Sequence, residues 1–478
     1  MSDTPSWALS ASSLAKEIRD GVLSAKSAAR SAVERMRAVN GHYNAVVDDL
    51  GDAALEEAAA LDRLMSERGS VGPLHGVPVT VKINVDQAGY ATSNGVAAFT
   101  STIADTDSPV VRNLRNAGAI IIGRTNTPEF SFRATTDNPH FGRTINPWKE
   151  SASPGGSSGG AGVAVMTGMG ALAHGNDLGG SLRYPAAATG AATIKPGLGR
   201  VPAYNASAGK ERGLLAQLMS TQGILARQAG DLRLGLQALI AYDPRDPWMV
   251  PMEFRGPSSP EATRVAVTRD GLGFGLSPQT STALDNACEA LRRSGYEVVE
   301  VEPPLLRECG DTGFRALMSE SAKLLQPDIQ RFGSSQLNQI FENHLQAFPP
   351  FSEGELLRVM AQRSWFVREW LMFLEQYPLL LTPFMLGPVH DWNRDAEGVE
   401  GAEDVLGRGQ YSYAMNFLGL PAGIVSAHFD GGMPVGVQIV GRRFREDMII
   451  DALEAVEAYA GTVFERLWNG IDSLQTPE

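Results

Sequence analysis

Two serines in glycine-rich segments and one lysine in an apolar segment are the residues that could do chemistry. Ser157 lies in PGGSSGG (154–160), and Ser181 lies in NDLGGSLRYPA (176–186). Lys82 lies near the end of the apolar run VPVTVKI, which predicts a strand that carries a lone cation into the interior. A serine hydroxyl becomes a nucleophile when a base removes its proton. The three residues therefore predict a hydrolase with a Ser–Ser–Lys site.

The base could be the lysine or a histidine. At the ordinary pKa of about 10.4, about one lysine in a thousand is neutral near pH 7, so burial must lower the pKa by about three units, or about 4 kcal/mol. The valines that flank Lys82 supply apolar surroundings of this kind. A lysine whose ammonium reaches solvent from a strand end is the alternative. His75, His140 and His174 also stay open as bases, because sequence position excludes none of them.

The two glycines before Ser181 predict an oxyanion hole. Gly179 and Gly180 have no side chains that would keep backbone N–H groups away from a developing negative charge. Donors of this type contribute roughly 10²- to 10³-fold in rate each. We expect Ser181 to attack and the backbone from Leu178 to Ser181 to hold the oxyanion.

Three other motifs match known signatures without the context that these need. Ser158 is the centre of a G-x-S-x-G string, but a loop sequence precedes it rather than the strand of a nucleophile elbow. Ser13 and Lys16 form S-x-x-K within a predicted amphipathic helix. The run GGSSGG is not followed by G-K-[ST], as a phosphate-binding loop would be. We therefore expect none of these motifs to carry the chemistry.

Composition limits the expected partners and location. The chain has 478 residues, of which 41 are basic and 54 acidic, with a formal charge of −13. No block of Lys and Arg is present, so no nucleic-acid partner is expected. Cys288 and Cys309 are too few for a disulfide framework and lack zinc-site spacing, and we expect no metal or cofactor. The N-terminus does not read as a signal peptide, and no run of about 18 apolar residues occurs, which favours a cytoplasmic protein without membrane contact.

The elements that must position the site alternate between strands and helices. Residues 1–70 predict an N-terminal helical segment, and residues 77–125 predict a strand–helix–strand unit. A second such unit follows at 263–301, with Ser277 as the helix N-cap and Pro278 at the first helical position. Because a crossover helix joins each pair of strands, we expect parallel pairing.

The second half of the chain predicts a helical insertion and a return of strands. Residues 305–377 are mostly helical in pattern, strands resume at 378–384, and a helix over 445–460 closes the chain. No linker separates these parts, so we expect one domain over residues 1–478. The fold class is α/β, with a large mixed, mostly parallel, twisted sheet surrounded by helices.

Six strings together resemble the amidase signature family, and they extend through most of the chain. They are PGGSSGG (154–160), GNDLGGSLRYPA (175–186), VPVTVKI (77–83), GRTNTPEF (123–130), NPHFGRTINPW (138–148) and GMPVGVQIVG (432–441). The resemblance implies the amidase signature fold, with Ser181 as nucleophile, Ser157 as bridging serine in a cis peptide and Lys82 as base. Lys82 would take a proton from Ser157, and Ser157 from Ser181. The reverse relay would protonate the leaving amine before water hydrolyses the acyl-enzyme.

The resemblance also implies roles for residues around the three. Phe130 and Ser131 would lie near the substrate channel. Ser158, Asp177 and Arg183 would support the reacting groups. Family members build a variable acyl pocket from the middle region of the chain and from loops such as TPFMLGP (382–388). The predicted helix around 356–374 lies in this middle region and carries an apolar stripe. A stripe of this kind more often packs in a protein core than lines a pocket.

Two departures from the family pattern are present. Asn176 stands where serine or threonine is common before the aspartate, and SAHFDGG (426–432) replaces a more usual proline-containing stretch. We expect both to change the shape of the pocket without touching Lys82, Ser157 or Ser181.

The predicted function is hydrolysis of a small-molecule carboxamide, with an apolar or aryl acyl group as the favoured substrate. A carbamate, urea-derivative or cyclic-amide hydrolase of the same family is the first alternative. The glutaminase subunit of a tRNA-dependent amidotransferase is the second, although its DGVRYG-like string is not seen. A catalytically silent scaffold is the third. The sequence leaves open whether the chain forms a homodimer.

Overall fold

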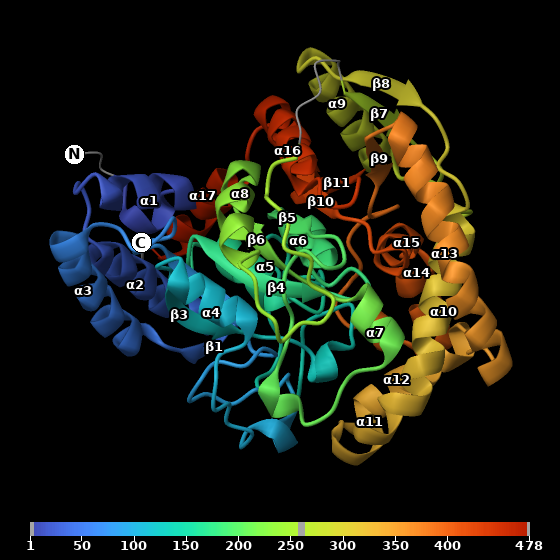
Figure 1. The fold of residues 1–478 in the computed structure, drawn as a ribbon, viewed down its shortest axis with the longest axis horizontal. Helices are drawn as coiled ribbons and strands as arrows, with labels where there is room; N and C mark the ends of the chain where they lie inside the picture. The colour runs from blue at the N-terminus through green and yellow to red at the C-terminus, as the bar shows by residue number, and fades with distance from the viewer. Residues whose placement is uncertain (1–3, 257–262, 476–478) are drawn as a thin grey trace.

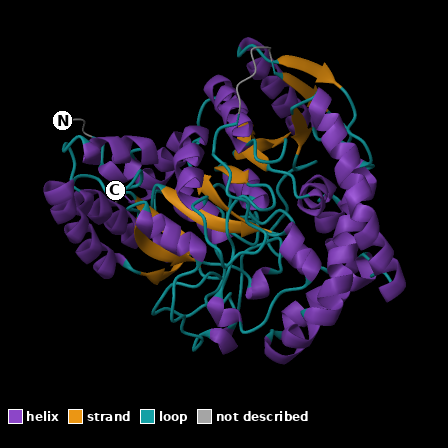
Figure 2. Cartoon of the chain, viewed as in Figure 1, coloured by secondary structure: helices purple, strands orange, loops and turns teal. Residues whose placement is uncertain are grey.

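In the computed structural model, which describes residues 4–256 and 263–475, the strands form one sheet surrounded by helices (Figures 1 and 2). The described residues contribute eleven strands, in the order β1-β3-β2-β4-β6-β5-β10-β11-β9-β7-β8. The strands are β1 (Val46–Asp49), β2 (Pro78–Lys82), β3 (Ile120–Thr125), β4 (Leu172–Asp177), β5 (Ala192–Lys195), β6 (Thr221–Ala226), β7 (Arg264–Val267), β8 (Glu297–Glu300), β9 (Leu379–Pro383), β10 (Ala422–Asp430) and β11 (Met433–Gly441).

The sheet is mixed, as the sequence predicts, but the expectation that it is mostly parallel is wrong. Parallel pairs join β3, β2 and β4 near one edge and β9, β7 and β8 at the other. All pairs from β4 through β6, β5, β10 and β11 to β9 are antiparallel. One physical reason is the turn between β10 and β11, where Gly431 and Gly432 have φ values of 57° and 80°. A turn with positive φ at both central residues favours an antiparallel hairpin.

Helices occupy both ends of the molecule and cover the sheet between them (Figure 1). Helices α1–α3 lie at one end, and α10–α13 lie along the other. The helices are α1 (Ala11–Arg19), α2 (Ala25–Tyr43), α3 (Gly51–Arg68), α4 (Pro109–Asn116), α5 (Gly159–Met166), α6 (Arg183–Thr189), α7 (Leu214–Met219), α8 (Ala229–Leu239), α9 (Pro278–Arg293), α10 (Leu306–Leu324), α11 (Gln326–Phe332), α12 (Ser335–Ala347), α13 (Glu353–Gln376), α14 (Gly398–Gly407), α15 (Gln410–Leu418), α16 (Glu446–Ala460) and α17 (Phe464–Gln475).

Several of these elements form where local sequence signals place them. The two predicted strand–helix–strand units are β2–α4–β3 and β7–α9–β8, and both strand pairs are parallel. The Ser277 side chain accepts a hydrogen bond from the N–H of Thr280, and Pro278 begins α9. Four helices, α10–α13, fill residues 306–376. That the whole chain is one domain stays a prediction, and residues 1–3, 257–262 and 476–478 lie outside the described residues.

The core lies against strands that are buried along their whole length. Every residue of β2, β3, β6 and β9 is buried, and these strands are mostly apolar, as strands buried on both faces usually are. On α13, Trp370 and Leu374 are fully buried in a cluster with α15, so this part of the stripe belongs to the core. Cys288 and Cys309 are buried and free.

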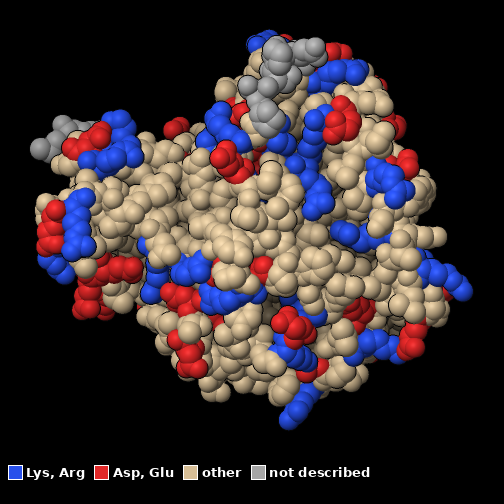
Figure 3. All heavy atoms as spheres, in the orientation of Figure 1, with Lys and Arg blue, Asp and Glu red and all other residues tan. Residues whose placement is uncertain are grey.

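Basic and acidic side chains intermingle over the face seen in Figure 3. Within the described ranges, no helix has the length and apolar character needed to cross a bilayer. The same residues hold no group of three or more His, Cys, Asp or Glu side chains arranged for a metal ion.

Candidate active site

Lys82 ends β2 and points into the protein rather than into solvent. Its side chain is 0% exposed. The Nζ atom lies 2.7 Å from Ser157 Oγ and 3.1 Å from Ser158 Oγ. Burial lowers the pKa of Lys82 well below its ordinary value, while the charge of Asp177 acts in the opposite direction. A solvent-exposed ammonium is therefore excluded, and the neutral amine is favoured.

Ser157 lies in the loop that precedes α5. The Gly156–Ser157 peptide bond is cis, as the resemblance implies. Residue 156 must be small, because a Cβ there would lie 2.4 Å from the carbonyl oxygen of Arg133. All residues of α5 are buried. Packing on both sides therefore fixes the loop that presents the Ser157 hydroxyl to Lys82.

Ser181 lies beside the same loop. Its carbonyl oxygen accepts a hydrogen bond of 3.1 Å from the N–H of Ser158. Ser181 is partly exposed, whereas Ser157 and Ser158 are buried. The fold therefore brings the two glycine-rich serine segments together and leaves Ser181 as the more accessible serine.

The Asp177 carboxylate shapes the backbone turn before Ser181. One of its oxygens accepts from the N–H of Gly180 at 2.8 Å, and the other from the N–H of Leu182 at 3.1 Å. Gly180 has a φ of 115°, a conformation that side chains other than hydrogen disfavour. The Gly180 N–H, one of the four groups predicted for the oxyanion hole, donates to Asp177 in this structure. An oxyanion hole formed by the backbone from Leu178 to Ser181 stays a prediction.

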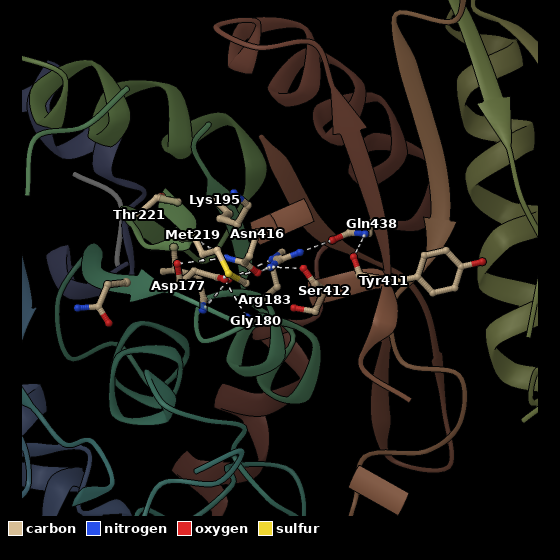
Figure 4. Close-up of polar contacts among 12 residues, drawn as sticks. Asp177, Gly180, Arg183, Lys195, Met219, Thr221, Tyr411, Ser412, Asn416 and Gln438 are labelled. Carbon is tan, nitrogen blue, oxygen red and sulfur yellow. Dashed lines mark hydrogen bonds and ion pairs between the residues drawn. The ribbon is translucent and has the colours of Figure 1, made fainter. Parts of the chain in front are cut away.

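Asp177 and Arg183 form a fully buried ion pair (Figure 4). Arg183 donates from Nε and from a terminal nitrogen to the two carboxylate oxygens, both at 3.0 Å. Burial alone would raise the pKa of Asp177, but the Arg183 guanidinium holds it well below its usual range. In the same region, burial lowers the pKa of Lys195 to about 7. Because the Arg183 guanidinium keeps its carboxyl group ionised, Asp177 is a fixed anion that holds the turn before Ser181 in place.

Two residues that the sequence analysis missed complete this network. Asn416, on α15, donates to Asp177 at 2.9 Å and accepts from Arg183 at 2.6 Å. Gln438, on β11, accepts from Arg183 at 2.8 Å. Gln438 lies within the string GMPVGVQIVG, which supported the resemblance but gave no hint of this contact. Both side chains therefore connect the turn before Ser181 to the C-terminal third of the chain.

Two of the three candidate histidines have other hydrogen-bond partners, and the third is exposed. His174 is fully buried, its Nε2 lies 2.9 Å from Gln222 Oε1, and burial lowers its pKa to about 4. The Nδ1 of His75 accepts from the N–H of Val71. His140 is exposed in a loop. Among the described residues, no hydrogen bond joins any of these rings to Ser157 or Ser181, whereas Lys82 makes one.

Phe130 and Ser131 lie in a strained turn. Their φ values are 54° and 55°, in the left-handed region that residues with side chains rarely adopt. Both residues are partly exposed, and the Phe130 ring contacts Phe99. The Ser131 hydroxyl donates to Asn94 Oδ1 at 2.6 Å. The Ser131 hydroxyl therefore already has a hydrogen-bond partner within the protein.

Asn176 contacts the candidate base directly. Its Oδ1 atom accepts from Lys82 Nζ at 2.9 Å. The expectation that this departure from the family pattern leaves the three central residues untouched is therefore wrong. The positions of the two residues on their strands explain the contact. Asn176 is the penultimate residue of β4, and Lys82 is the last residue of β2. The two strands pair with each other in parallel.

A cavity of about 370 Å³, which includes its open mouth, lies next to the serine loops. Its apolar lining includes Ala134, Tyr184, Met385 and Val389. Gly155, two positions before Ser157, also lines it, although Lys82, Ser157 and Ser181 themselves do not. The buried hydroxyl of Thr135 lines the cavity and has no hydrogen-bond partner among the described residues.

Comparisons with known proteins identify the family to which this chain belongs. The Amidase family model matches residues 27–450. An indoleacetamide hydrolase of Bradyrhizobium diazoefficiens is 43% identical over 469 residues, which cover 98% of this chain and 90% of that protein. A glutamyl-tRNA(Gln) amidotransferase subunit from Deinococcus radiodurans is 31% identical over 487 residues, covering 95% and 98%.

Two solved structures share the fold. A 6-aminohexanoate cyclic dimer hydrolase in complex with substrate superposes with a TM-score of 0.83 at 24% identity, covering 98% of this chain and 100% of its own. A bacterial aryl acylamidase superposes with a TM-score of 0.82 at 24% identity, covering 98% and 99%.

Proposed function

Since this chain belongs to the amidase family and is a hydrolase of carbon–nitrogen bonds other than peptide bonds, we propose that it cleaves small arylacetamides through an acyl-enzyme on Ser181. The observation that carries the proposed mechanism is the 2.7 Å separation between Lys82 Nζ and Ser157 Oγ in a buried site. This pair can begin a proton relay that needs no histidine.

The relay moves two protons, and its net result is the transfer of one proton from Ser181 to Lys82. Ser157 gives its hydroxyl proton to the neutral Lys82 amine and takes the proton of Ser181. The Ser181 oxygen then forms a bond to the amide carbon, and the carbonyl becomes an oxyanion. When the C–N bond breaks, Lys82 returns its proton through Ser157 to the leaving amine. Water, activated by the same relay, hydrolyses the ester on Ser181.

The tetrahedral oxyanion would be held by backbone donors of the turn before Ser181. The proposed donors are the N–H groups of Leu178, Gly179 and Ser181. Asp177 supports this role because its carboxylate fixes the N–H groups of Gly180 and Leu182 on either side of Ser181. A turn held in this way needs little rearrangement when the charge develops.

The cavity beside the loop is the proposed acyl pocket. Its exposed lining is mostly apolar, which suits an aryl group, and ligand sites are mostly apolar with a few placed polar groups. The unpartnered Thr135 hydroxyl is such a group, and it can accept a hydrogen bond from a ring N–H. Indoleacetamide offers both features, and the Bradyrhizobium relative is named for its hydrolysis.

The test is a substrate panel with the purified full-length protein. Ammonia or amine release is measured for indoleacetamide, phenylacetamide, an aliphatic amide, a carbamate, a cyclic amide and glutamine. We expect the highest kcat/KM for indoleacetamide. A preference for the carbamate or the cyclic amide would establish the first alternative, and a preference for glutamine would establish the second. The cytoplasmic location, a homodimer and the lack of a nucleic-acid partner stay predictions.

A further inference from the structure

The Lys82 amine has three polar neighbours, and one of them is an amide oxygen. Nζ lies 2.7 Å from Ser157 Oγ, 3.1 Å from Ser158 Oγ and 2.9 Å from Asn176 Oδ1. A neutral amine carries two N–H donors and one lone pair. A base for Ser157 must turn that lone pair, and neither of its hydrogens, toward the serine hydroxyl.

Two of the three neighbours can only accept a hydrogen bond from Lys82. The Asn176 Oδ1 atom carries no hydrogen. The Ser158 hydroxyl directs its hydrogen to the carbonyl oxygen of Asn176, at 3.3 Å, and so presents a lone pair to the amine. These two acceptors take both N–H groups. The position that remains on the tetrahedral nitrogen is the lone pair, and it faces Ser157.

The orientation of the Asn176 amide is itself fixed by Asn84. Asn176 donates from Nδ2 to Asn84 Oδ1 at 2.9 Å, which turns its oxygen toward Lys82. Asn84 donates in turn from Nδ2 to Ser131 Oγ at 3.0 Å and to Asn176 Oδ1 at 3.3 Å. Ser131 accepts there because its own hydrogen goes to Asn94 at 2.6 Å. In this series of hydrogen bonds, the direction of each bond is therefore fixed by the next one.

We infer that Asn176, oriented by Asn84, is a positioning residue that directs the lone pair of the Lys82 amine toward Ser157. The inference rests on the proposed relay. A serine or threonine at position 176 would carry a hydroxyl that both donates and accepts, so it would not impose this direction. After proton transfer, the ammonium has three N–H groups for the same three acceptors. The arrangement therefore satisfies both protonation states without movement.

The experiment measures how fast a fluorophosphonate probe labels Ser181 as a function of pH. This readout needs no amide substrate, so it separates the inference from the proposed substrate class. Asn176→Leu keeps the size of the side chain and removes the acceptor, and we expect labelling to slow by about 10²-fold. Asn84→Leu should slow labelling by a smaller factor. Asn113→Leu is the matched control, because Asn113 is a buried amide that bonds to the carbonyls of Leu239 and Ala241.

Asn176→Asp supplies a second measurement that does not depend on the leucine variant folding. A carboxylate beside the amine favours the ammonium, as Asp177 already does, while buried His174 stays neutral. We expect the midpoint of the labelling profile to rise by more than about one pH unit. Wild-type rates and an unchanged midpoint in the position-176 variants would overturn the inference, as would an equal loss in Asn113→Leu. Absence of labelling in the wild-type protein would instead refute the proposed function.

Discussion

The Nζ atom of Lys82 lies 2.7 Å from the Oγ atom of Ser157, and both side chains are buried. An ammonium at this position would be poorly solvated, so burial lowers the pKa of Lys82 well below its ordinary value. The short contact and the low pKa have one consequence together. The lysine can be neutral at a pH well below its ordinary pKa, and it can then accept a proton from the serine.

The first prediction concerns the identity of the base. We expect kcat/KM to rise with pH as Lys82 loses its proton. His174, with its pKa lowered to about 4, is already neutral between pH 5 and 10. His174→Gln should therefore keep the midpoint of the pH–rate profile, and the measurement is kcat/KM between pH 5 and 10. A profile that loses its acid limb in this variant would assign the base to the histidine.

The second prediction concerns stability. Because the pKa of Lys82 is lower in the folded protein than in the unfolded chain, the unfolded chain binds more protons between the two values. The free energy of unfolding therefore rises with pH across that interval, up to about pH 10.4. Lys82→Met lacks this contribution. Denaturant unfolding should show that wild type gains stability relative to Lys82→Met as pH rises, and a constant difference would contradict the low pKa.

The third prediction concerns the buried ion pair. Asp177→Asn keeps the shape of the side chain but leaves the Arg183 charge without its counterion, and it should lower the free energy of unfolding by about 3–5 kcal/mol. Asp20→Asn is the matched control, because Asp20 pairs with Lys16 at the surface. Urea unfolding of both variants compares the two sites. Equal stability of the two variants would show that the buried pair does not hold the fold.

The fourth prediction concerns the proposed acyl pocket. Thr135→Val removes the unpartnered hydroxyl and keeps the volume of the side chain. One neutral hydrogen bond contributes about 0.5–1.5 kcal/mol, so kcat/KM for indoleacetamide should fall by up to about tenfold. For phenylacetamide and for indoleacetamide methylated on the ring nitrogen, which both lack the ring N–H, kcat/KM should be unaffected. An equal fall for all three amides would place the ring elsewhere.

Local signals in the sequence predict much of the framework. The units β2–α4–β3 and β7–α9–β8 follow from apolar runs on either side of a helical pattern. The burial of Lys82 follows from the valines around it. Strand β1 and the antiparallel middle of the sheet do not emerge from such signals, because pairing there depends on turns and on contacts between distant segments. Gly431 and Gly432 are the available signal for the hairpin.

The hydrogen-bond network that holds the turn before Ser181 is harder to predict. Asn416 meets Asp177 across 239 positions of sequence, and Gln438 meets Arg183 across 255. No spacing rule connects residues this far apart. Asn176 stands out in the sequence as a departure from the family pattern, but its contact with Lys82 depends on the pairing of β4 with β2. Its role can therefore be seen only once the strands are placed.

We propose that Lys82 activates Ser181 through Ser157. The most direct measurement is the rate of fluorophosphonate labelling, with the labelled peptide identified by mass spectrometry, in wild type, Ser181→Ala and Lys82→Met. We predict a label on Ser181 whose rate increases with pH, no label in Ser181→Ala, and labelling about 10²- to 10⁴-fold slower in Lys82→Met. A label on another residue, or a wild-type rate in Lys82→Met, would refute the proposed relay.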